Sequence, residues 1–101
     1  MKIDFKIETL LEVHSTSEFK RQLKKLYKQG KDINKLRQVI EKLANKEKLD
    51  EKYQNHMLND SKKYKNCGEC HIEPDWLLVY QYIDDELVLL LVTTGSHSEI
   101  F

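Results

Sequence analysis

The sequence predicts an α+β domain in which two antiparallel helices pack on one face of a mostly antiparallel β-sheet. Two consecutive segments with helical periodicity lie in the first half of the chain, and two strongly strand-like segments lie near its end. A chain of 101 residues is long enough for one modest hydrophobic core. We therefore expect residues 1–101 to form a single domain, with both helices on the buried face of the sheet.

The N-terminal segment has the alternation of a β-strand. Ile3, Phe5 and Ile7 alternate with charged residues, and the alternation resumes at Leu11 and Val13 after an interruption. A period of two places these apolar side chains on one face of a strand. The pattern predicts a first strand that is broken near its middle.

The first helix is expected from Thr16 to about Gln29. Ser15 and Glu18 have the spacing of a capping box, in which Ser15 accepts a hydrogen bond from the backbone N–H of Glu18. Gly30 suits the position just after the helix, where a left-handed conformation is common. The residues predicted to form the apolar face are Phe19, Leu23, Leu26 and Tyr27.

Asp32 is expected to cap a second helix. The link between the two helices is short, so they should run antiparallel. A polar connection follows from Lys46 to Tyr53, within which Leu49 is the expected apolar anchor. The apolar stripe of the second helix is predicted to comprise Ile33, Leu36, Val39, Ile40 and Leu43.

The last third of the chain is expected to be mainly strand. Residues 64–72 have a weaker strand pattern that Gly68 interrupts, residues 76–83 form a confident strand, and residues 87–94 form another after a turn at Asp84–Asp85. Residues 87–92 are apolar at every position, which is typical of a strand buried on both faces. This last strand should therefore lie inside the sheet rather than at its edge.

Charge is balanced overall but unevenly distributed. There are 17 basic and 17 acidic residues, and eight of the basic residues lie between Lys20 and Arg37 with one acidic residue among them. Such a segment is either a solvated helix surface or a surface that docks onto a polyanion. The sequence has no apolar run long enough for a membrane span and no hydrophobic signal segment, so we expect a cytoplasmic protein with no membrane partner.

The segment Cys67–His71 matches the CxxCH signature of c-type haem attachment. Haem attachment would require export, which the N-terminus does not suggest, and a disulfide is disfavoured in a reducing cytoplasm. Zinc is an alternative, with Cys67 and Cys70 joined by two of the three histidines His56, His71 and His97. We favour a simpler interpretation in which Cys70 packs as a small apolar residue, Cys67 lies in a loop, and no metal or cofactor is bound.

Polar and aromatic residues gather where the two confident strands would meet. If residues 76–83 and 87–94 pair as a hairpin, the start of the first strand lies beside the end of the second. The residues this pairing would bring together are His71, Asp75, Trp76 and His97.

Three blocks in the chain resemble the YafQ-type toxins of bacteria, which belong to the RelE-like group of toxin–antitoxin ribonucleases. The blocks are His56–Leu58, His71–Tyr80 and Gly95–Phe101, and the resemblance extends from about Ser15 to the C-terminus. It implies a microbial-ribonuclease-like fold and an endoribonuclease, an mRNA interferase, that cleaves mRNA on the ribosome. It also implies a cognate antitoxin as partner.

The resemblance implies roles for six residues of these blocks. Cleavage without metal needs a base for the 2′-OH proton, a positive group for the charge of the phosphorane and an acid for the 5′-oxygen, and imidazoles suit both proton transfers. By the resemblance, His97 is the acid, and Trp76 and Phe101 stack on nucleobases or wall the cleft. The base side would comprise His56, His71 and Asp75.

Two arginines of the family pattern are replaced here, by Gly68 and Thr93. Thr93 would then meet the substrate in place of an arginine. Lysines of the preceding loop are expected to supply the positive charge, as point charges rather than bidentate forks. They are Lys62, Lys63 and Lys65.

Three functions are therefore compatible with the sequence. The first is a toxin that cleaves mRNA on the ribosome and is held inactive by an antitoxin. The second is a catalytically weak or silent binding module with the same fold, which the loss of both arginines favours. The third is a small zinc protein built around Cys67 and Cys70.

Overall fold

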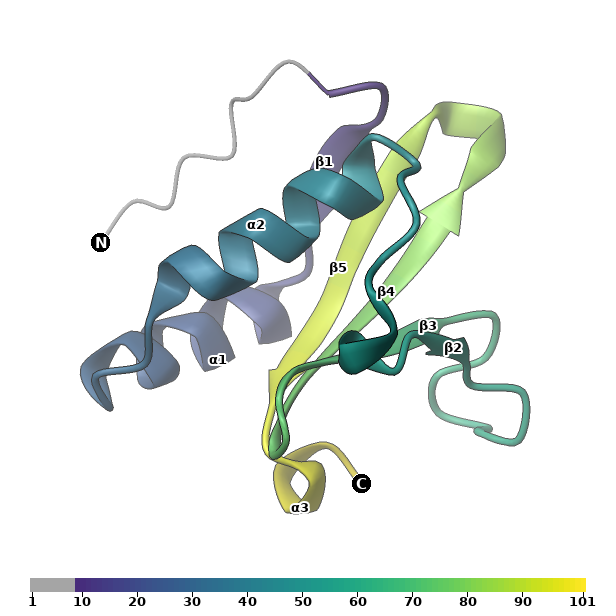
Figure 1. Ribbon diagram of the computed structural model, residues 1–101. Coiled ribbons are helices and arrows are strands. Elements are labelled where there is room, and N and C mark those ends of the chain that lie inside the picture. The colour runs from purple at the N-terminus through teal and green to yellow at the C-terminus, as the bar shows by residue number, and fades with distance from the viewer. Residues whose placement is uncertain (1–8) are drawn as a thin grey trace.

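A five-stranded sheet organises the protein, and a computed structural model describes residues 9–101 (Figure 1). The strands lie in the order β1-β5-β4-β3-β2. β1 runs parallel to β5, and every other neighbouring pair is antiparallel. The strands are β1 (Glu12–Ser15), β2 (His56–Met57), β3 (Gly68–Glu73), β4 (Trp76–Ile83) and β5 (Val88–Gly95).

Two long helices, α1 (Ser17–Lys28) and α2 (Ile33–Ala44), lie on the same side of this sheet (Figure 1). Their buried residues join Cys70, Leu78 and Leu89 in the main core. The opposite face carries a smaller core to which Leu77, Val79 and Ile100 contribute. The short elements are η1 (Glu51–Tyr53), η2 (Asp84–Glu86) and α3 (His97–Ile100). The predicted α+β class is confirmed, and no helix within residues 9–101 could cross a membrane.

The start of α1 differs by one residue from the prediction. Thr16, not Ser15, caps the helix, and its hydroxyl accepts from the backbone N–H of Phe19 at 3.0 Å. Ser15 is instead the last residue of β1 and pairs with Leu91 of β5. Because the parallel pairing extends to Ser15, the helix can begin only after it. The predicted part of the first strand at residues 3–7 lies outside the described residues.

The apolar face of α1 is narrower than expected. Phe19, Leu23 and Leu26 are buried as predicted, but Tyr27 is 55% exposed. At 100° per residue, Tyr27 lies about 70° from the centre of the stripe formed by the other three, so it faces solvent. Gly30 follows the helix with a φ of 82° and donates to the carbonyl of Tyr27, as predicted for the C′ position.

The cap and stripe of α2 are confirmed. Asp32 accepts from the backbone N–H of Asn34 at 3.0 Å, and the stripe residues of α2 are buried except for Ile33, which is partly buried. Leu49 anchors the connection that follows and is 5% exposed.

The interior position predicted for the last strand is also confirmed, since β5 lies between β1 and β4. Leu87 is not part of it. This residue has a φ of 54° at the end of η2 and is 64% exposed, because the short 3₁₀ turn reverses the chain there.

β3 begins at Gly68, whereas the sequence pattern suggested a start at residue 64. Asn66 adopts a φ of 63°, and the backbone N–H of Cys67 closes a turn onto the carbonyl of Tyr64, so these residues leave the ladder. Gly68 lies opposite Tyr80, whose ring occupies the space of a side chain. A Cβ on Gly68 would lie 2.5 Å from Cζ of Tyr80. An arginine cannot replace Gly68 without moving this ring.

Gly68→Ala is therefore expected to destabilise the protein by about 1–3 kcal/mol through overpacking. Tyr80 is 3% exposed, and its hydroxyl donates to Asn55 Oδ1, so the ring cannot move aside freely. Urea unfolding measures the loss. In a Tyr80→Val background the ring is absent and the cost of Gly68→Ala should disappear; an equal cost in both backgrounds would show that the ring is not its cause.

Candidate active site

Two imidazoles share one carboxylate at the β2 edge of the sheet. His56 of β2 lies directly opposite Glu69 of β3, and His71 lies two residues beyond Glu69 on the same face. Glu69 Oε1 is 3.5 Å from Nε2 of His56 and 3.6 Å from Nε2 of His71. Glu69 is 6% exposed, which makes it one of the few buried polar residues of the described chain. The arrangement places two imidazoles, each able to carry a proton, against one carboxyl group.

The orientation of His56 is set by a backbone contact. Its Nδ1 lies 2.7 Å from the carbonyl oxygen of Gln54, which can only accept, so Nδ1 carries the proton. Gln54 presents this carbonyl from a left-handed conformation, with a φ of 47°. The other nitrogen of His56 faces Glu69 and is the one that exchanges a proton, a division of roles that suits a general base.

His97 is held at the other end of the site by the hairpin of β4 and β5. Asp75, just before β4, accepts the backbone N–H of His97 through Oδ1 at 3.0 Å. Ser96 and Glu99 form a capping box around the start of α3. The prediction that the hairpin ends bring Asp75 and His97 together is therefore confirmed.

An ion pair fixes α3 against α1. Lys25 Nζ lies 2.8 Å from Glu99 Oε2, and hydrogen bonds from Lys25 and then Ser96 lower the pKa of Glu99 to about 2. A group with so low a pKa stays charged at every pH at which imidazoles titrate. The ion pair between Lys25 and Glu99 should therefore persist across that range.

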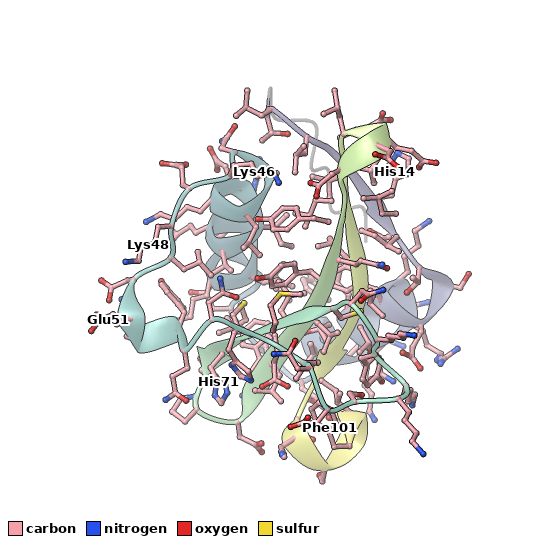
Figure 2. The ribbon with its side chains drawn as sticks, turned by 90° about the vertical axis from the view of Figure 1, so that its right-hand side faces the viewer. His14, Lys46, Lys48, Glu51, His71 and Phe101 are labelled. Carbon is pink, nitrogen blue, oxygen red and sulfur yellow. The ribbon has the colours of Figure 1, made fainter. Side chains whose placement is uncertain are left out.

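Phe101 lies beside His97 and shares a hollow with His56. Its ring is 54% exposed, and its centroid lies 5.2 Å from that of His97 and 5.8 Å from that of Tyr64. Phe101 and His56 also line one shallow hollow of about 380 Å³. Figure 2 shows His71 and Phe101 at the same end of the molecule and His14 at the opposite end. An exposed aromatic beside both histidines fits the predicted nucleobase contact.

Three expectations about the site need correction. Trp76 is 1% exposed and donates from Nε1 to Thr94 Oγ1, so it is part of the core and offers no face to a nucleobase. Thr93 is 3% exposed and pairs with Val79 inside the sheet, so it has no open surface for a substrate. Asp75, expected on the base side with His56 and His71, instead accepts the backbone N–H of His97, and the carboxylate within 4 Å of His71 is that of Glu69.

The three loop lysines are all exposed, as a charge-supplying role requires. Lys63 lies beside the aromatic rings, since its Nζ is 5.2 Å from the ring centroid of Tyr64, which contacts Phe101. Lys62 and Lys65 flank it in the same loop.

The two cysteines lie in different cores. Cys70 packs in the main core with no exposed surface, and burial raises its pKa to about 12. Cys67 lies in the loop before β3 and contributes to the core on the opposite face, where burial raises its pKa as well. Two thiols on opposite faces of a sheet cannot ligate one zinc ion, and within residues 9–101 no group of three such ligands is arranged around a point. The interpretation of Cys70 as an apolar core residue is confirmed.

Comparison with known proteins identifies the family. A family described as "Bacterial toxin of type II toxin-antitoxin system, YafQ" matches residues 11–101. Among curated relatives, the "mRNA interferase toxin YafQ" of Escherichia coli strain B / BL21-DE3 is 32% identical over 91 residues, which cover 89% of this chain and 95% of the relative.

Solved structures agree with this assignment. A metal-bound toxin from Helicobacter pylori is 42% identical, with a TM-score of 0.84 over 90% of this chain and 99% of that one. YafQ in the E. coli DinJ–YafQ complex is 32% identical, with a TM-score of 0.80 over 90% of this chain and 98% of that one. The fold, the histidine cluster and the sequence comparison lead to one assignment: the chain belongs to the YafQ family of toxins from bacterial type II toxin–antitoxin systems.

Proposed function

We propose that this protein is an mRNA interferase, an endoribonuclease that cleaves mRNA on the ribosome without a metal ion and so inhibits translation. The observation that carries the proposal is the pair of imidazoles on Glu69, with His97 and the exposed Phe101 close by. The name of the E. coli relatives, mRNA interferase toxin, supports the same activity. The test is to induce the protein without an antitoxin and to map new 5′ ends in cellular mRNA.

The geometry suggests the following reaction. One imidazole of the pair, His56 or His71, removes the proton of the 2′-OH, and the 2′-oxygen attacks the adjacent phosphorus. His97, positioned by Asp75, protonates the departing 5′-oxygen. The products are a 2′,3′-cyclic phosphate and a 5′-OH. A lysine of the loop, with Lys63 the best placed, balances the charge of the phosphorane.

Glu69 orients both imidazoles and stabilises whichever of them has gained the proton. Glu69→Gln keeps the shape but removes the charge, and we expect mRNA cleavage on programmed ribosomes to slow about tenfold or more. The pH dependence of the rate should also shift, which a purely structural effect would not cause. Glu47→Gln makes the same change at an exposed position outside the site and serves as the control. An unchanged rate and pH profile for Glu69→Gln would contradict this role.

We also propose a cognate antitoxin, since YafQ has been solved in complex with DinJ. The basic residues of α1 and α2 suggest an acidic partner segment that becomes ordered on binding. Lys20, Lys24 and Lys28 follow one another at helical spacing along the exposed surface of α1.

Association with the antitoxin should therefore slow as salt is raised. At low salt, a Lys24→Gln/Lys28→Gln variant should associate more slowly than the wild type, and a Lys46→Gln/Lys48→Gln variant with the same charge change should not. Stopped-flow measurement with the purified antitoxin gives both rates. Association that does not depend on salt would indicate an apolar contact elsewhere.

A catalytically silent binding module is the second candidate. Gly68 and the buried Thr93 replace the two arginines of the family pattern, which removes two donors for the phosphorane. The same cleavage assay decides between the candidates, because a silent module would bind the antitoxin and leave mRNA intact.

A further inference from the structure

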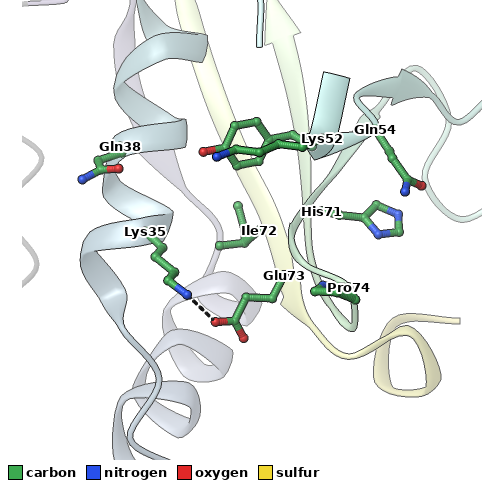
Figure 3. Close-up of a pocket in the computed structure, with 9 residues that line it drawn as sticks. Lys35, Gln38, Lys52, Gln54, His71, Ile72, Glu73 and Pro74 are labelled. Atoms are coloured by element: carbon green, nitrogen blue, oxygen red, sulfur yellow. Dashed lines mark hydrogen bonds and ion pairs between the residues drawn. The ribbon is translucent and has the colours of Figure 1, made fainter. Parts of the chain in front are cut away.

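A second, larger hollow is lined by His71 of the imidazole pair. It has a volume of about 630 Å³, within the roughly 300–1,000 Å³ of ligand-binding clefts. In Figure 3, Lys35 and Gln38 of α2 lie on one side of it and Gln54 and His71 on the other. Among the described residues β2 pairs only with Gly68 and Glu69, so the rest of β3 is left as an open edge along this hollow.

The hollow carries an excess of positive charge. Glu73 is held by Lys31 at 3.2 Å and by Lys35 at 3.0 Å, and hydrogen bonds from Lys35 and then Lys31 lower the pKa of Glu73. One carboxylate is thus matched by two ammonium groups. Lys31 does not line the hollow itself, whereas Lys35 and Lys52 do, and within residues 9–101 Lys52 forms no ion pair. A phosphate group would find a favourable field here.

Beside this charge lie groups that fit a nucleobase. Tyr53 is half-buried and lines the hollow, and Lys52 Nζ is 5.1 Å from the centroid of its ring. The amides of Gln38 and Gln54 offer both donors and acceptors to the edge of a base. A stacking surface, a neighbouring ammonium group and side-chain amides are elements by which proteins bind unpaired nucleotides.

The hollow adjoins the proposed active site through His71. His71 lines it and also faces Glu69, while His56 faces the same carboxylate and lines the hollow that contains Phe101. A single strand that crosses the imidazole pair would therefore have one hollow on each side of the reacting phosphate. This placement distinguishes the hollow from a remote patch.

We propose that the hollow formed by Lys35, Lys52, Tyr53 and His71 binds one unpaired nucleotide of the RNA substrate, next to the scissile phosphate. The base lies against Tyr53 and the phosphate near Lys52. The inference rests on the proposed ribonuclease function and adds to it a second nucleotide subsite, opposite the one at Phe101.

The first experiment measures binding of a fluorescein-labelled, single-stranded RNA in which every ribose is 2′-O-methylated, so that it cannot be cleaved. Tyr53→Leu removes the aromatic ring but keeps an apolar side chain, and it should weaken binding about tenfold. Tyr53→Phe keeps the ring and should bind like the wild type. Because Tyr53 also packs against the core, circular dichroism must show that Tyr53→Leu is folded before its loss of affinity is assigned to stacking.

The second experiment measures how the affinity depends on salt. Lys52→Gln should reduce the slope of log K against log salt by about 0.7, as expected for one phosphate contact with a single strand. Lys48→Gln, an exposed lysine outside the hollow, should leave the slope unchanged. Glu73→Gln should tighten binding, since it frees Lys31 and Lys35 to meet phosphate.

The outcomes separate this inference from the function on which it rests. Wild-type affinity and salt slope in both Tyr53→Leu and Lys52→Gln would overturn the subsite, even if the protein cleaves mRNA normally. Loss of RNA affinity in these variants would support the subsite, even if mRNA on programmed ribosomes is not cleaved and the proposed function fails. Variants that lose affinity only for the antitoxin would assign the hollow to that partner and overturn the subsite.

Discussion

Cells that express the His97→Ala variant are expected to grow and translate at the rate of uninduced cells, whereas the unaltered protein arrests both. His97 is the group placed to protonate the departing 5′-oxygen, and it has no substitute on α3. Loss of a general acid costs about 10²–10⁴-fold in rate. Such a loss should be enough to relieve the arrest.

The substitution should leave the fold intact. His97 is exposed, and the contacts that fix α3 come from its backbone N–H, from the capping box and from the Lys25–Glu99 ion pair. Circular dichroism and binding of the antitoxin test this directly. If a folded His97→Ala variant is as toxic as the parent, His97 is not the acid.

A second histidine provides a matched control. His14 lies at the far end of the molecule, in β1, where its imidazole is 3.1 Å from Glu12 (Figure 2). His14→Ala removes the same group from a position without a role in the proposed reaction. It should remain fully toxic, so relief by both variants would point to a general loss of expression or stability.

The sequence predicts most of the fold because its signals are local. The stripe of α2, the cap at Asp32 and the apolar run of β5 each lie within one element, and each is confirmed. Where the structure differs from these predictions, contacts between segments far apart in the sequence set the ends of the elements. Ser15 joins β1 because β5 extends alongside it, and a turn at Asn66 delays the start of β3.

The centre of the candidate site is harder to predict for the same reason. Glu69 faces both imidazoles only because β2 pairs with β3 in one particular register, and β2 is just two residues long. The one sequence signal for this contact is that Glu69 and His71 are two residues apart, which places them on the same face of a strand. The strand pattern of residues 64–72 is weak, so this signal does not identify the pair. Trp76 is the opposite case, a residue that the sequence assigns to the site and the structure places in the core. An aromatic residue at the start of a strand can face either the core or a cleft, and the sequence alone does not decide which.

Cleavage is expected to proceed with EDTA-treated protein and to leave a 2′,3′-cyclic phosphate, or its 3′-phosphate product, and a 5′-OH. The site offers imidazoles for both proton transfers. A hard cation such as Mg²⁺ needs oxygen ligands, and one or two carboxylates usually hold it together with substrate phosphates. Here the carboxylate of Glu69 faces two imidazoles, and Asp75 Oδ1 accepts the backbone N–H of His97. We therefore expect the neighbouring 2′-OH to be the nucleophile.

Two properties follow from this mechanism. An RNA with a 2′-deoxy residue at the cut position should not be cleaved, because the nucleophile is missing. The rate should depend on pH in a bell-shaped manner, because one imidazole must be neutral and another protonated. The ion pair of Glu99 keeps α3 in place across this range, so the profile should report the imidazoles rather than a change in fold.

The decisive measurement uses a defined mRNA on programmed ribosomes. The ribosome should accelerate the reaction, because ribosomal RNA holds the message in position and replaces the orientation that the missing arginines would provide. The 5′ end of the downstream product is labelled by a kinase without prior phosphatase treatment, which succeeds only on a 5′-OH. Products with a 5′-phosphate would exclude 2′-OH attack, as would cleavage of the 2′-deoxy substrate. Activity that EDTA abolishes and Mg²⁺ restores would show that a cation, rather than a lysine such as Lys63, balances the charge of the phosphorane.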